Sequence, residues 1–310
     1  MELIYFNDYL NKYNYELAVT IGSFDGIHLA HQQLINETKI ASEKLNCKSA
    51  VITFDPHPSL LFNKDSHYLL TDFETKKEII SSLGVDFLIL IPFDIEFASI
   101  SPKSFVNDYL IKLKVKEVVV GSDFRFGCKG SGTALSIPNL SDNKINVQIV
   151  ELINYDGEKI GSTKIKNLFK IGEVEKANKL LGYTYYFKGN VIKGNNVGEK
   201  IGFPTANIKN DNIKKILKPG VYGVLVYVDN VKYLGMMNIG HNPTCNLVDE
   251  LSTEVNIFDF NENLYEKEVS ICCLCFVRDE MKFNSVDELI NQLKSDKEFI
   301  INKNHILAIK

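Results

Sequence analysis

Apolar positions in the first 182 residues alternate between short continuous runs and longer stretches with a helical period. A continuous run predicts a strand that is covered on both faces, as in a parallel sheet. The stretch at residues 29–45 is amphipathic, and Thr71–Glu74 has the pattern of a capping box for a helix that ends at Gly84. Ser101 before Pro102 marks another helix start. The apolar runs lie at residues 17–21, 49–54, 86–92, 117–120 and 147–151. Strands that alternate with helices predict an α/β fold for this half.

After Gly182 the pattern changes to a period of two residues, with turn residues between the segments. Asp229–Asn230 is a tight hairpin signal, and Ser285 has the position of an N-cap for a terminal helix. The strand candidates are residues 183–191, 221–228, 231–239, 254–258 and 269–277. Several short strands with one terminal helix predict a small β-barrel. The sequence therefore predicts two domains, residues 1–182 and residues 183–310.

Length and composition fit two globular domains. The chain has 310 residues, of which 45% are hydrophobic and 24% charged, so each half can bury a core. Lys and Arg total 35, and Asp and Glu total 39. The net charge of −4 argues against nucleic acid or an anionic membrane as the main partner. No apolar run approaches the ~20 residues of a membrane helix, and the N-terminus lacks the pattern of a signal peptide. None of these features predicts an oligomeric state.

The six cysteines include a crowded group, Cys272, Cys273 and Cys275. Their spacing is not that of a disulfide framework, so the expected location is the reducing cytoplasm. In a strand, Cys273 and Cys275 share one face and Cys272 lies on the other, which disfavours a shared metal site. We expect buried thiols here to pack as small hydrophobic groups.

The first candidate site is the segment Gly22–His31, GSFDGIHLAH, which stands between the first predicted strand and the helix that follows it. Ligands bind at this position in open parallel sheets, because glycines let the backbone approach a phosphate and a helix N-terminus attracts an anion. His28 and His31 share one helical face, so both can donate hydrogen bonds to phosphate oxygens. The alternatives are an ordinary surface turn or a zinc site, for which no third ligand is spaced nearby.

Three further segments of the first half fit either ordinary structure or a ligand contact. Thr53–Pro58, TFDPHP, is a stiff loop or a rigid platform for a flat ring, because a residue before Pro is held extended. Gly121–Gly127, GSDFRFG, is a turn with core aromatics or a contact for adenine or ribose. Gly161–Lys166, GSTKIK, is an ordinary helix start or an anion site made of cap amides and two lysines.

The second half contains a glycine-rich basic loop, which includes Gly194, Gly198 and Lys200. This loop is either a flexible surface loop or a flap over the phosphates of ATP. Thr205 and Asn207 follow it, two residues apart. A hydroxyl and an amide oxygen are hard ligands of the kind that Mg²⁺ prefers. The segment therefore indicates a candidate magnesium site beside a phosphate-binding loop.

Taken together, these segments resemble the bifunctional riboflavin kinase/FMN adenylyltransferases, the bacterial FAD synthetases. GSFDGIHLAH resembles the HxGH signature of the nucleotidyltransferase superfamily, and GSDFRFG and GSTKIK resemble the G-x-D/N-F-R-F-G and I-S-S-T-x-I-R motifs of the adenylyltransferase half. TFDPHP resembles its flavin-side loop. Gly202–Asn207, GFPTAN, resembles the G-x-P-T-A-N motif of riboflavin kinase. The resemblance implies an α/β Rossmann-like nucleotidyltransferase domain, followed by a small β-barrel riboflavin kinase domain with a C-terminal helix.

The resemblance also implies two reactions. ATP phosphorylates riboflavin to FMN, and a second ATP adenylylates FMN to FAD with release of pyrophosphate. Glu254 occupies the position of the base that takes the proton from the riboflavin 5′-hydroxyl, Thr205 and Asn207 are the implied Mg²⁺ ligands, and His28 and His31 are catalytic in the other half. The implied nucleotide-binding residues are Gly22, Phe24, Asp25, Gly26, Asp123, Arg125, Ser162, Thr163, Lys166, Gly194, Gly198 and Lys200. The implied flavin-binding residues are Phe54, Pro56, His57 and Pro58. Riboflavin, FMN and ATP are the expected partners, and Mg²⁺ is the expected cofactor.

Three residues depart from the family pattern in the adenylyltransferase half. Ala30 replaces the Gly of HxGH, Gly161 replaces a Ser, and Lys166 replaces an Arg. Lys keeps the charge but lacks the planar fork that binds two phosphate oxygens. One alternative is therefore a riboflavin kinase with a weak or silent adenylyltransferase half. Another is a flavin-nucleotide-binding regulatory protein, although such a protein needs no base at Glu254.

Overall fold

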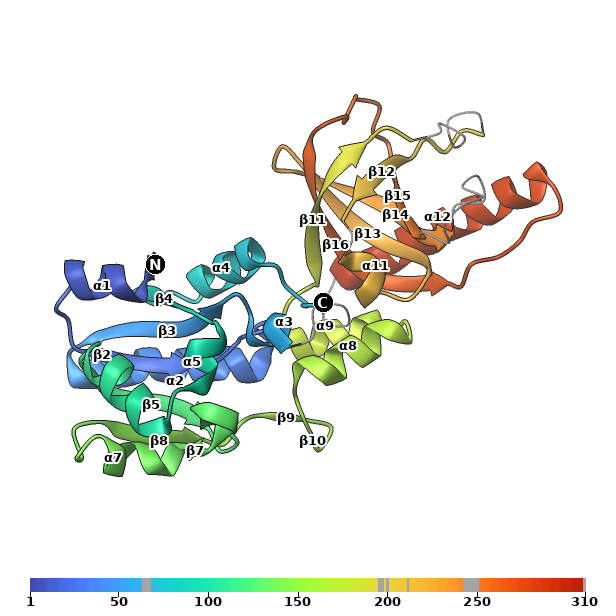
Figure 1. Ribbon diagram of the computed structural model, residues 1–310. Coiled ribbons are helices and arrows are strands. Elements are labelled where there is room, and N and C mark those ends of the chain that lie inside the picture. Colours follow the sequence, from blue (N-terminus) through green and yellow to red (C-terminus); the bar gives the residue numbers. More distant parts are fainter. Residues whose placement is uncertain (63–67, 195–197, 199–200, 211, 242–250, 309–310) are drawn as a thin grey trace. The chain divides into compact units, whose positions relative to one another are not determined.

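The computed structural model describes residues 1–62, 68–194, 198, 201–210, 212–241 and 251–308 (Figure 1). The chain divides into two compact units, Met1–Ser162 and Thr163–Lys310. Each unit has its own sheet and its own hydrophobic core.

The first unit is built on a six-stranded sheet with the strand order β1-β4-β3-β2-β5-β8. Each pair of neighbouring strands is parallel, which confirms the predicted α/β fold. The apolar pattern did not predict β1. The strands are β1 (Glu2–Tyr5), β2 (Leu17–Ile21), β3 (Lys48–Asp55), β4 (Phe87–Pro92), β5 (Val115–Gly121) and β8 (Asn146–Val150). Two short antiparallel ribbons accompany the sheet, β6 (Arg125–Phe126) with β7 (Gly132–Thr133), and β9 (Asn154–Tyr155) with β10 (Glu158–Lys159).

Helices cover both faces of this sheet. Side chains of α2 and α4 pack with residues such as Val51 on one face, while α1, α6 and the helices around it pack with residues such as Ile52 on the other. The sheet is therefore buried on both sides, as its continuous apolar strands predicted. The helices are α1 (Phe6–Lys12), α2 (Leu29–Leu45), α3 (Pro58–Phe62), α4 (Phe73–Ser82), α5 (Ile95–Ser99), α6 (Pro102–Phe105), η1 (Val106–Ile111), η2 (Cys128–Gly130), η3 (Ala134–Ser136) and α7 (Ile137–Leu140).

Two helix starts differ in detail from the predicted pattern. The N-cap of α4 is Asp72, whose carboxylate accepts the Thr75 N–H at 2.7 Å, so the predicted capping box at Thr71 is wrong by one residue. The Thr71 hydroxyl instead accepts the Gly26 N–H at 3.2 Å, which links the residue before α4 to the turn between β2 and α2. Ser101 caps α6 as predicted, and the helix then continues as the π-helical turn η1.

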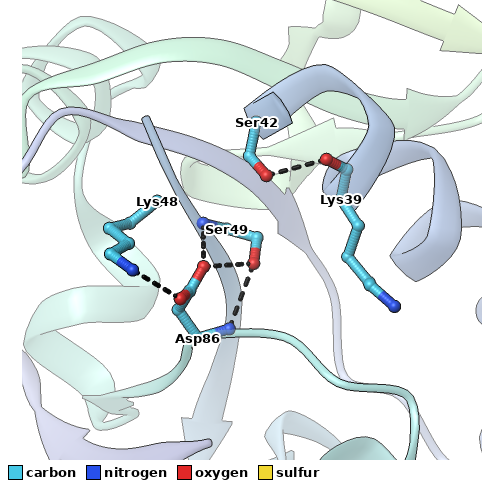
Figure 2. Close-up of polar contacts among 5 residues, drawn as sticks. All are labelled: Lys39, Ser42, Lys48, Ser49 and Asp86. Atoms are coloured by element: carbon cyan, nitrogen blue, oxygen red, sulfur yellow. Dashed lines mark hydrogen bonds and ion pairs between the residues drawn. The ribbon is translucent and has the colours of Figure 1, made fainter. Parts of the chain in front are cut away.

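Asp86 fastens the amino ends of β3 and β4 (Figure 2). Its carboxylate accepts hydrogen bonds from the Lys48 ammonium at 2.9 Å and from the Ser49 N–H and hydroxyl at 2.9 and 2.7 Å. Burial alone would raise the pKa of Asp86, but these hydrogen bonds outweigh burial and lower it. The carboxylate therefore stabilises the fold above the ordinary Asp pKa, and its contribution is lost as the pH falls through the lowered value.

The second unit contains a closed barrel with the strand order β11-β12-β15-β14-β13-β16, in which β16 pairs back with β11. All of its strand pairs are antiparallel, so the predicted small β-barrel is confirmed. Asp229 and Asn230 join β13 to β14 with φ values of 48° and 67°, as expected for the predicted hairpin turn. The strands are β11 (Tyr186–Ile192), β12 (Ala206–Lys209), β13 (Gly220–Val228), β14 (Val231–His241), β15 (Leu251–Ile257) and β16 (Glu268–Arg278).

Burial alternates along β16, where Cys273 and Cys275 are buried and Cys272 is only partly buried. The predicted packing of these thiols as buried hydrophobic groups is confirmed for Cys273 and Cys275. Helix α12 (Val286–Ala308) follows the barrel, and its Asp296 forms a 2.9 Å ion pair with Arg278 of β16. The predicted C-terminal helix is thus held against the barrel by a largely buried charge pair.

Helices α8 (Ser162–Lys170) and α9 (Val174–Leu181) precede the barrel, and α11 (Ile213–Ile216) lies between β12 and β13. Asn178 of α9 donates to the Cys273 carbonyl and accepts the Tyr185 N–H, both at 2.9 Å. The rings of Phe169 in α8 and Tyr185 pack at 4.7 Å between centroids. Both helices therefore pack with the barrel, although the predicted boundary places them before it. The domain boundary at 182/183 stays a prediction.

Candidate active sites

The turn between β2 and α2 is fastened by side chains from distant segments. The Asp25 carboxylate accepts the Leu70 N–H at 2.7 Å and the Thr71 N–H at 3.4 Å. The Asp25 carbonyl accepts the Ser162 hydroxyl at 2.7 Å, and the Gly26 N–H bonds to Thr71. Asp25 is only 5% exposed, so its carboxylate holds the turn in shape. The structure thus brings together Asp25, Gly26 and Ser162, which the sequence predicted for one site.

His28 and His31 lie against each other at the start of α2. Their rings stack with centroids 3.6 Å apart, and the Phe24 and His31 rings form a T-shaped pair with centroids 5.1 Å apart. His28 is the N-cap of α2, and its Nδ1 accepts the His31 N–H at 3.4 Å. A ring nitrogen that accepts a hydrogen bond carries no proton, so the proton of neutral His28 is assigned to Nε2.

Both histidines are held neutral near pH 7. Burial lowers the pKa of His28 to about 4, against a smaller opposing effect of the Asp25 charge. Burial, the neighbouring His28 and the Lys76 ammonium together hold the pKa of His31 well below its usual value. Within the described residues, the buried Nδ1 of His31 has no hydrogen-bond partner. The pair can therefore offer neutral N–H donors to an anion.

A cavity of about 610 Å³ opens beside this turn, and aromatic side chains dominate its wall. Gly22 and Ser23 line it at the turn, and the cations of Arg125 and Lys129 lie among its lining residues. The aromatic lining comprises Phe54, Phe93, Phe97, Phe105, Phe124 and Phe126. Such a cavity suits a flat apolar ring that carries an anionic group.

The predicted flavin residues divide into two groups around this cavity. Phe54 and Pro58 line it, whereas Pro56 and His57 are not among its lining residues. The His57 ring bonds locally, with its Nδ1 2.7 Å from the Ser59 hydroxyl. The peptide bond between Asp55 and Pro56 in this segment is cis.

Asp123 of the GSDFRFG segment forms an ion pair with Lys159 of β10. The hydrogen bond from Lys159 is the main reason why the pKa of Asp123 is lowered. Sequence reasoning missed Lys159, although it stands three residues before Ser162. Thr163 and Lys166 follow Ser162 in α8 and fall in the second compact unit.

The second candidate site lies on the barrel, where three oxygen-bearing side chains meet. The Thr205 hydroxyl donates to the Glu254 carboxylate at 3.1 Å. Asn207 of β12 stands directly opposite Glu254 of β15 in the antiparallel pairing. Directly paired residues share one face of a sheet, so Glu254 and Asn207 point to the same side. The structure therefore brings together all three residues that the sequence predicted for the base and the metal.

Two glycines lie so close to this cluster that a larger residue at either position would require neighbouring atoms to move. A Cβ on Gly194 would lie 1.9 Å from the side-chain nitrogen of Asn207. A Cβ on Gly198 would lie 2.2 Å from the Phe203 carbonyl oxygen and 3.4 Å from the Thr205 hydroxyl. The glycine-rich loop thus approaches the predicted metal ligands where the structure describes it. Lys200, also predicted for nucleotide binding, lies outside the described residues.

A cavity of about 420 Å³ adjoins the barrel cluster. Thr205 lines it and links it to Glu254. Asn256 of β15 donates to the Pro204 carbonyl at 2.6 Å, which fixes the segment before Thr205. The remaining lining residues are Val191, Ala206, Val255, Ile257, Phe260, Asn261, Glu262, Asn263, Leu264 and Tyr265.

Comparison with known proteins identifies both halves. A family model described as FAD synthetase matches residues 10–164, and one described as riboflavin kinase matches residues 181–303. The bifunctional riboflavin kinase/FMN adenylyltransferase of Listeria monocytogenes is 41% identical over 284 residues, which cover 91% of this chain and 90% of that protein. This chain belongs to the bifunctional riboflavin kinase/FMN adenylyltransferase family.

A second relative carries the same name, and one solved structure shares the fold of this chain. The bifunctional riboflavin kinase/FMN adenylyltransferase of Bacillus subtilis is 39% identical over 285 residues, with 91% of this chain and 90% of that protein covered. A crystal structure of a Streptococcus pneumoniae protein named as a macrolide-efflux protein matches with a TM-score of 0.86 and 33% identity, covering 94% of this chain and 97% of that one. No helix in the described part of this chain has the length and apolar character that a membrane span requires.

Both halves of the riboflavin kinase/FMN adenylyltransferase family are present in their usual chain order, which confirms the bifunctional interpretation over the kinase-only alternative. The departures from the family motifs have different surroundings. Ala30 is 1% exposed, so its methyl group packs inside the protein. A Cβ on Gly161 would meet nothing within 4 Å, so a Ser would fit there.

Proposed function

We propose that this chain makes FAD from riboflavin in two steps, one in each unit. In the second unit, the 5′-hydroxyl oxygen of riboflavin attacks the γ-phosphorus of ATP and gives FMN and ADP. In the first unit, a phosphate oxygen of FMN attacks the α-phosphorus of a second ATP and gives FAD and pyrophosphate. The observation that carries the proposal is a contrast between the sites: a carboxylate with two hard oxygens in one, and two neutral histidines in the other.

Glu254 would act as the general base of the first step. A ribityl hydroxyl is a poor nucleophile, so removal of its proton during attack accelerates the transfer. Glu254 is half-buried, and its hydrogen bond from Thr205 fixes the orientation of the carboxylate. The carboxylate would accept the proton that the hydroxyl loses as the new P–O bond forms.

Thr205 and Asn207 would hold Mg²⁺ for this step. The fit rests on the donor set: a hydroxyl oxygen and an amide oxygen lie beside one carboxylate, and glycines leave room for phosphates next to them. Bound Mg²⁺ would neutralise charge on the phosphates of ATP. The Thr205 hydroxyl donates its hydrogen to Glu254, so its lone pairs stay available for a cation.

His28 and His31 would bind the phosphates of ATP in the second step. The FMN phosphate is already an anion, so this step needs positioning and stabilisation of charge but no base. Neutral imidazoles, each with one N–H donor, meet that need. Ser162 would belong to the same site, because its hydroxyl bonds to the turn that carries the histidines. Lys166 would supply a further cation, as the resemblance of GSTKIK to the family's phosphate motif implies.

The aromatic cavity beside the turn would take the flavin ring of FMN. Its wall of six Phe rings matches a flat aromatic ligand, and Arg125 is positioned to meet an anionic group. Riboflavin, FMN and ATP would be the small-molecule partners, in the cytoplasm and without nucleic acid. The net charge of −4 does not oppose this proposal, because local cations decide how a small anion binds.

One time course tests the proposal. The pure protein is incubated with riboflavin, ATP and Mg²⁺, and riboflavin, FMN and FAD are separated by chromatography. FMN should rise first and FAD should follow it. Omission of Mg²⁺ should stop FMN formation. FMN without any FAD would contradict the second step, and binding of FMN without turnover of riboflavin would favour a flavin-nucleotide-binding regulatory protein.

A further inference from the structure

Lys76 is a buried charged residue that neither proposed step uses. It lies on α4, is only 4% exposed, and donates from Nζ to the Ser23 carbonyl oxygen at 2.7 Å. A buried ammonium group costs free energy unless hydrogen bonds and opposite charges compensate it. Its exposed neighbour Lys77 instead forms a surface ion pair with Glu74. Lys76 therefore lies under the turn between β2 and α2 for a reason other than keeping the surface soluble.

The hydrogen bond to Ser23 fixes the orientation of one peptide group in that turn. In a trans peptide the C=O and the N–H point in opposite directions. With the Ser23 carbonyl anchored toward α4, the Phe24 N–H is directed away from α4. Gly22 and Ser23 line the aromatic cavity assigned to the flavin ring, and the Phe24 ring contacts His31, which is assigned to the phosphates of ATP. Phe24 has a φ of 49°, an uncommon value for a bulky residue, which the surrounding contacts must maintain.

Charges around Lys76 also connect it to the histidine pair. Asp25 and Asp55 oppose the effect of burial on its ammonium group, and Lys76 is one cause of the lowered pKa of His31. A cation at this place adds to burial in keeping His31 neutral, and it adds positive potential beneath the turn. The same potential favours the polyanionic triphosphate of ATP.

We propose that Lys76 is a positioning residue for AMP transfer, which holds the Ser23–Phe24 peptide so that the Phe24 N–H faces the triphosphate of ATP. This inference rests on the proposed adenylyl transfer in the first unit. Lys76 acts through the backbone of the turn and forms no bond to the reacting atoms. Its loss should therefore lower kcat for FAD formation more than it changes KM.

The test replaces Lys76 with Met, which keeps the length of the side chain and removes both its charge and its hydrogen bond. We expect kcat for FAD formation from supplied FMN to fall by ~10²-fold, as for a small misplacement of catalytic groups, while KM for FMN stays near that of the wild type. Riboflavin phosphorylation by the same chain should be unchanged. Lys77→Met controls for loss of charge on α4, and Ile80→Val controls for a packing loss at a fully buried position of the same helix.

Lys76→Arg provides a second measurement, which does not depend on the folding of Lys76→Met. Arg can donate to the same carbonyl and stays protonated at alkaline pH. Burial lowers the pKa of Lys76. As the pH rises, Lys76 should therefore lose its proton earlier than an exposed Lys would, and wild-type FAD formation should decline with it. Lys76→Arg should lack that decline. The charged groups that act on Lys76 are the carboxylates of Asp25 and Asp55, and Lys76 in turn acts on His31, which is held neutral.

Three results would overturn the inference. These are a wild-type kcat in folded Lys76→Met, an equal loss of kcat in Ile80→Val, and the same alkaline decline in Lys76→Arg as in the wild type. If the wild-type protein makes no FAD at all, the proposed adenylyl transfer is wrong, and the inference about Lys76 is wrong as well. Normal FAD formation by both wild type and Lys76→Met would refute the role of Lys76 alone.

Discussion

The Thr205 hydroxyl donates a hydrogen bond to Glu254 over 3.1 Å, which couples the candidate metal ligand to the candidate base. Thr205 comes just before β12, and Glu254 lies in β15, the strand that pairs with β12. The contact orients both oxygens at once, since the hydroxyl hydrogen points to the carboxylate. The two residues therefore act together, although they lie 49 positions apart in the sequence.

Replacement of Glu254 by Gln should nearly abolish FMN formation. Gln still accepts the Thr205 hydrogen bond, so the fold should persist, but it cannot take a proton. Loss of a general base typically lowers the rate by ~10²–10⁴-fold. FAD formation from supplied FMN should be unaffected, and Glu268→Gln, an exposed carboxylate at the start of β16, serves as the matched control. A near-normal rate of FMN formation in Glu254→Gln would show that another group is the base.

Replacement of His28 or His31 by Ala should slow FAD formation from FMN. Each change removes a donor that stabilises charge on the phosphates, which typically costs ~10²–10³-fold. Riboflavin phosphorylation, measured on the same sample, should stay near normal. Equal loss of both activities would contradict the assignment of two separate sites.

Lys166→Arg tests whether the departure from the family motif weakens the adenylyltransferase. If Lys166 binds phosphate, the planar fork of Arg should raise the rate of FAD formation. The comparison uses initial rates at saturating FMN and ATP. An unchanged rate would indicate that Lys166 makes no contact with the phosphates in the transition state.

Gly194→Ala and Gly198→Ala should each impair FMN formation. The new methyl groups would collide with the Asn207 side chain and the Phe203 carbonyl, at 1.9 and 2.2 Å, and would push the loop away from the metal ligands. A displacement of this kind should lower kcat by roughly tenfold or more. Gly161→Ala is the matched control, because its Cβ meets nothing within 4 Å. Wild-type rates in both variants would show that the loop moves away at no cost.

The histidine pair should stay neutral well below the ordinary pH of His titration. The pKa of His28 is about 4, so its ring signals in an NMR titration should not shift between pH 8 and ~5. Because the folded pKa lies below the unfolded value, the unfolded chain takes up protons first as the pH falls. Stability associated with His28 should therefore be lost between the unfolded pKa near 6.5 and about 4. A His28 signal that titrates near its ordinary pKa would contradict the buried geometry.

A fragment that starts at Thr163 should be more stable than one that starts at Tyr183. The shorter fragment lacks Asn178, so the buried Cys273 carbonyl and the Tyr185 N–H lose their partner. An unsatisfied buried group costs about 1–3 kcal/mol. Thermal unfolding and riboflavin phosphorylation of both fragments measure the difference. Equal stability would support the boundary at 182/183 that the sequence predicts.

Local patterns in the sequence were enough to predict most strands of the sheet and the barrel, and the long helices α2, α4 and α12. The run at Leu17–Ile21 and the helix at Leu29–Leu45 agree with the structure residue for residue, because strong periodicity and a glycine turn between them leave few alternatives. β12 was missed because it is only four residues long and partly exposed, so it has no clear apolar alternation. β1 was missed for a similar reason.

Long-range side-chain contacts could not be predicted from local patterns. Lys76 appears in the sequence as one of two adjacent lysines on an amphipathic helix, and only the tertiary structure separates the buried residue from the exposed one. Thr71 was placed in a capping box because its spacing to Glu74 fits, but Asp72 caps the helix and Thr71 bonds to Gly26. Spacing describes neighbours within one turn of a helix, and it carries no information about a partner 45 residues away.

Closure of the barrel has a consequence for the order in which the chain folds during synthesis. β16 pairs with β11, the first strand of the barrel, through Glu268–Cys272, so the barrel cannot close until these residues have left the ribosome. The parallel sheet is complete at residue 150, at the end of β8. Because domains generally fold as units as they emerge, the nucleotidyltransferase sheet can form while the kinase strands are still unpaired. A ribosome that stalls inside β16 would thus release a chain with a folded first unit and an open, aggregation-prone second one.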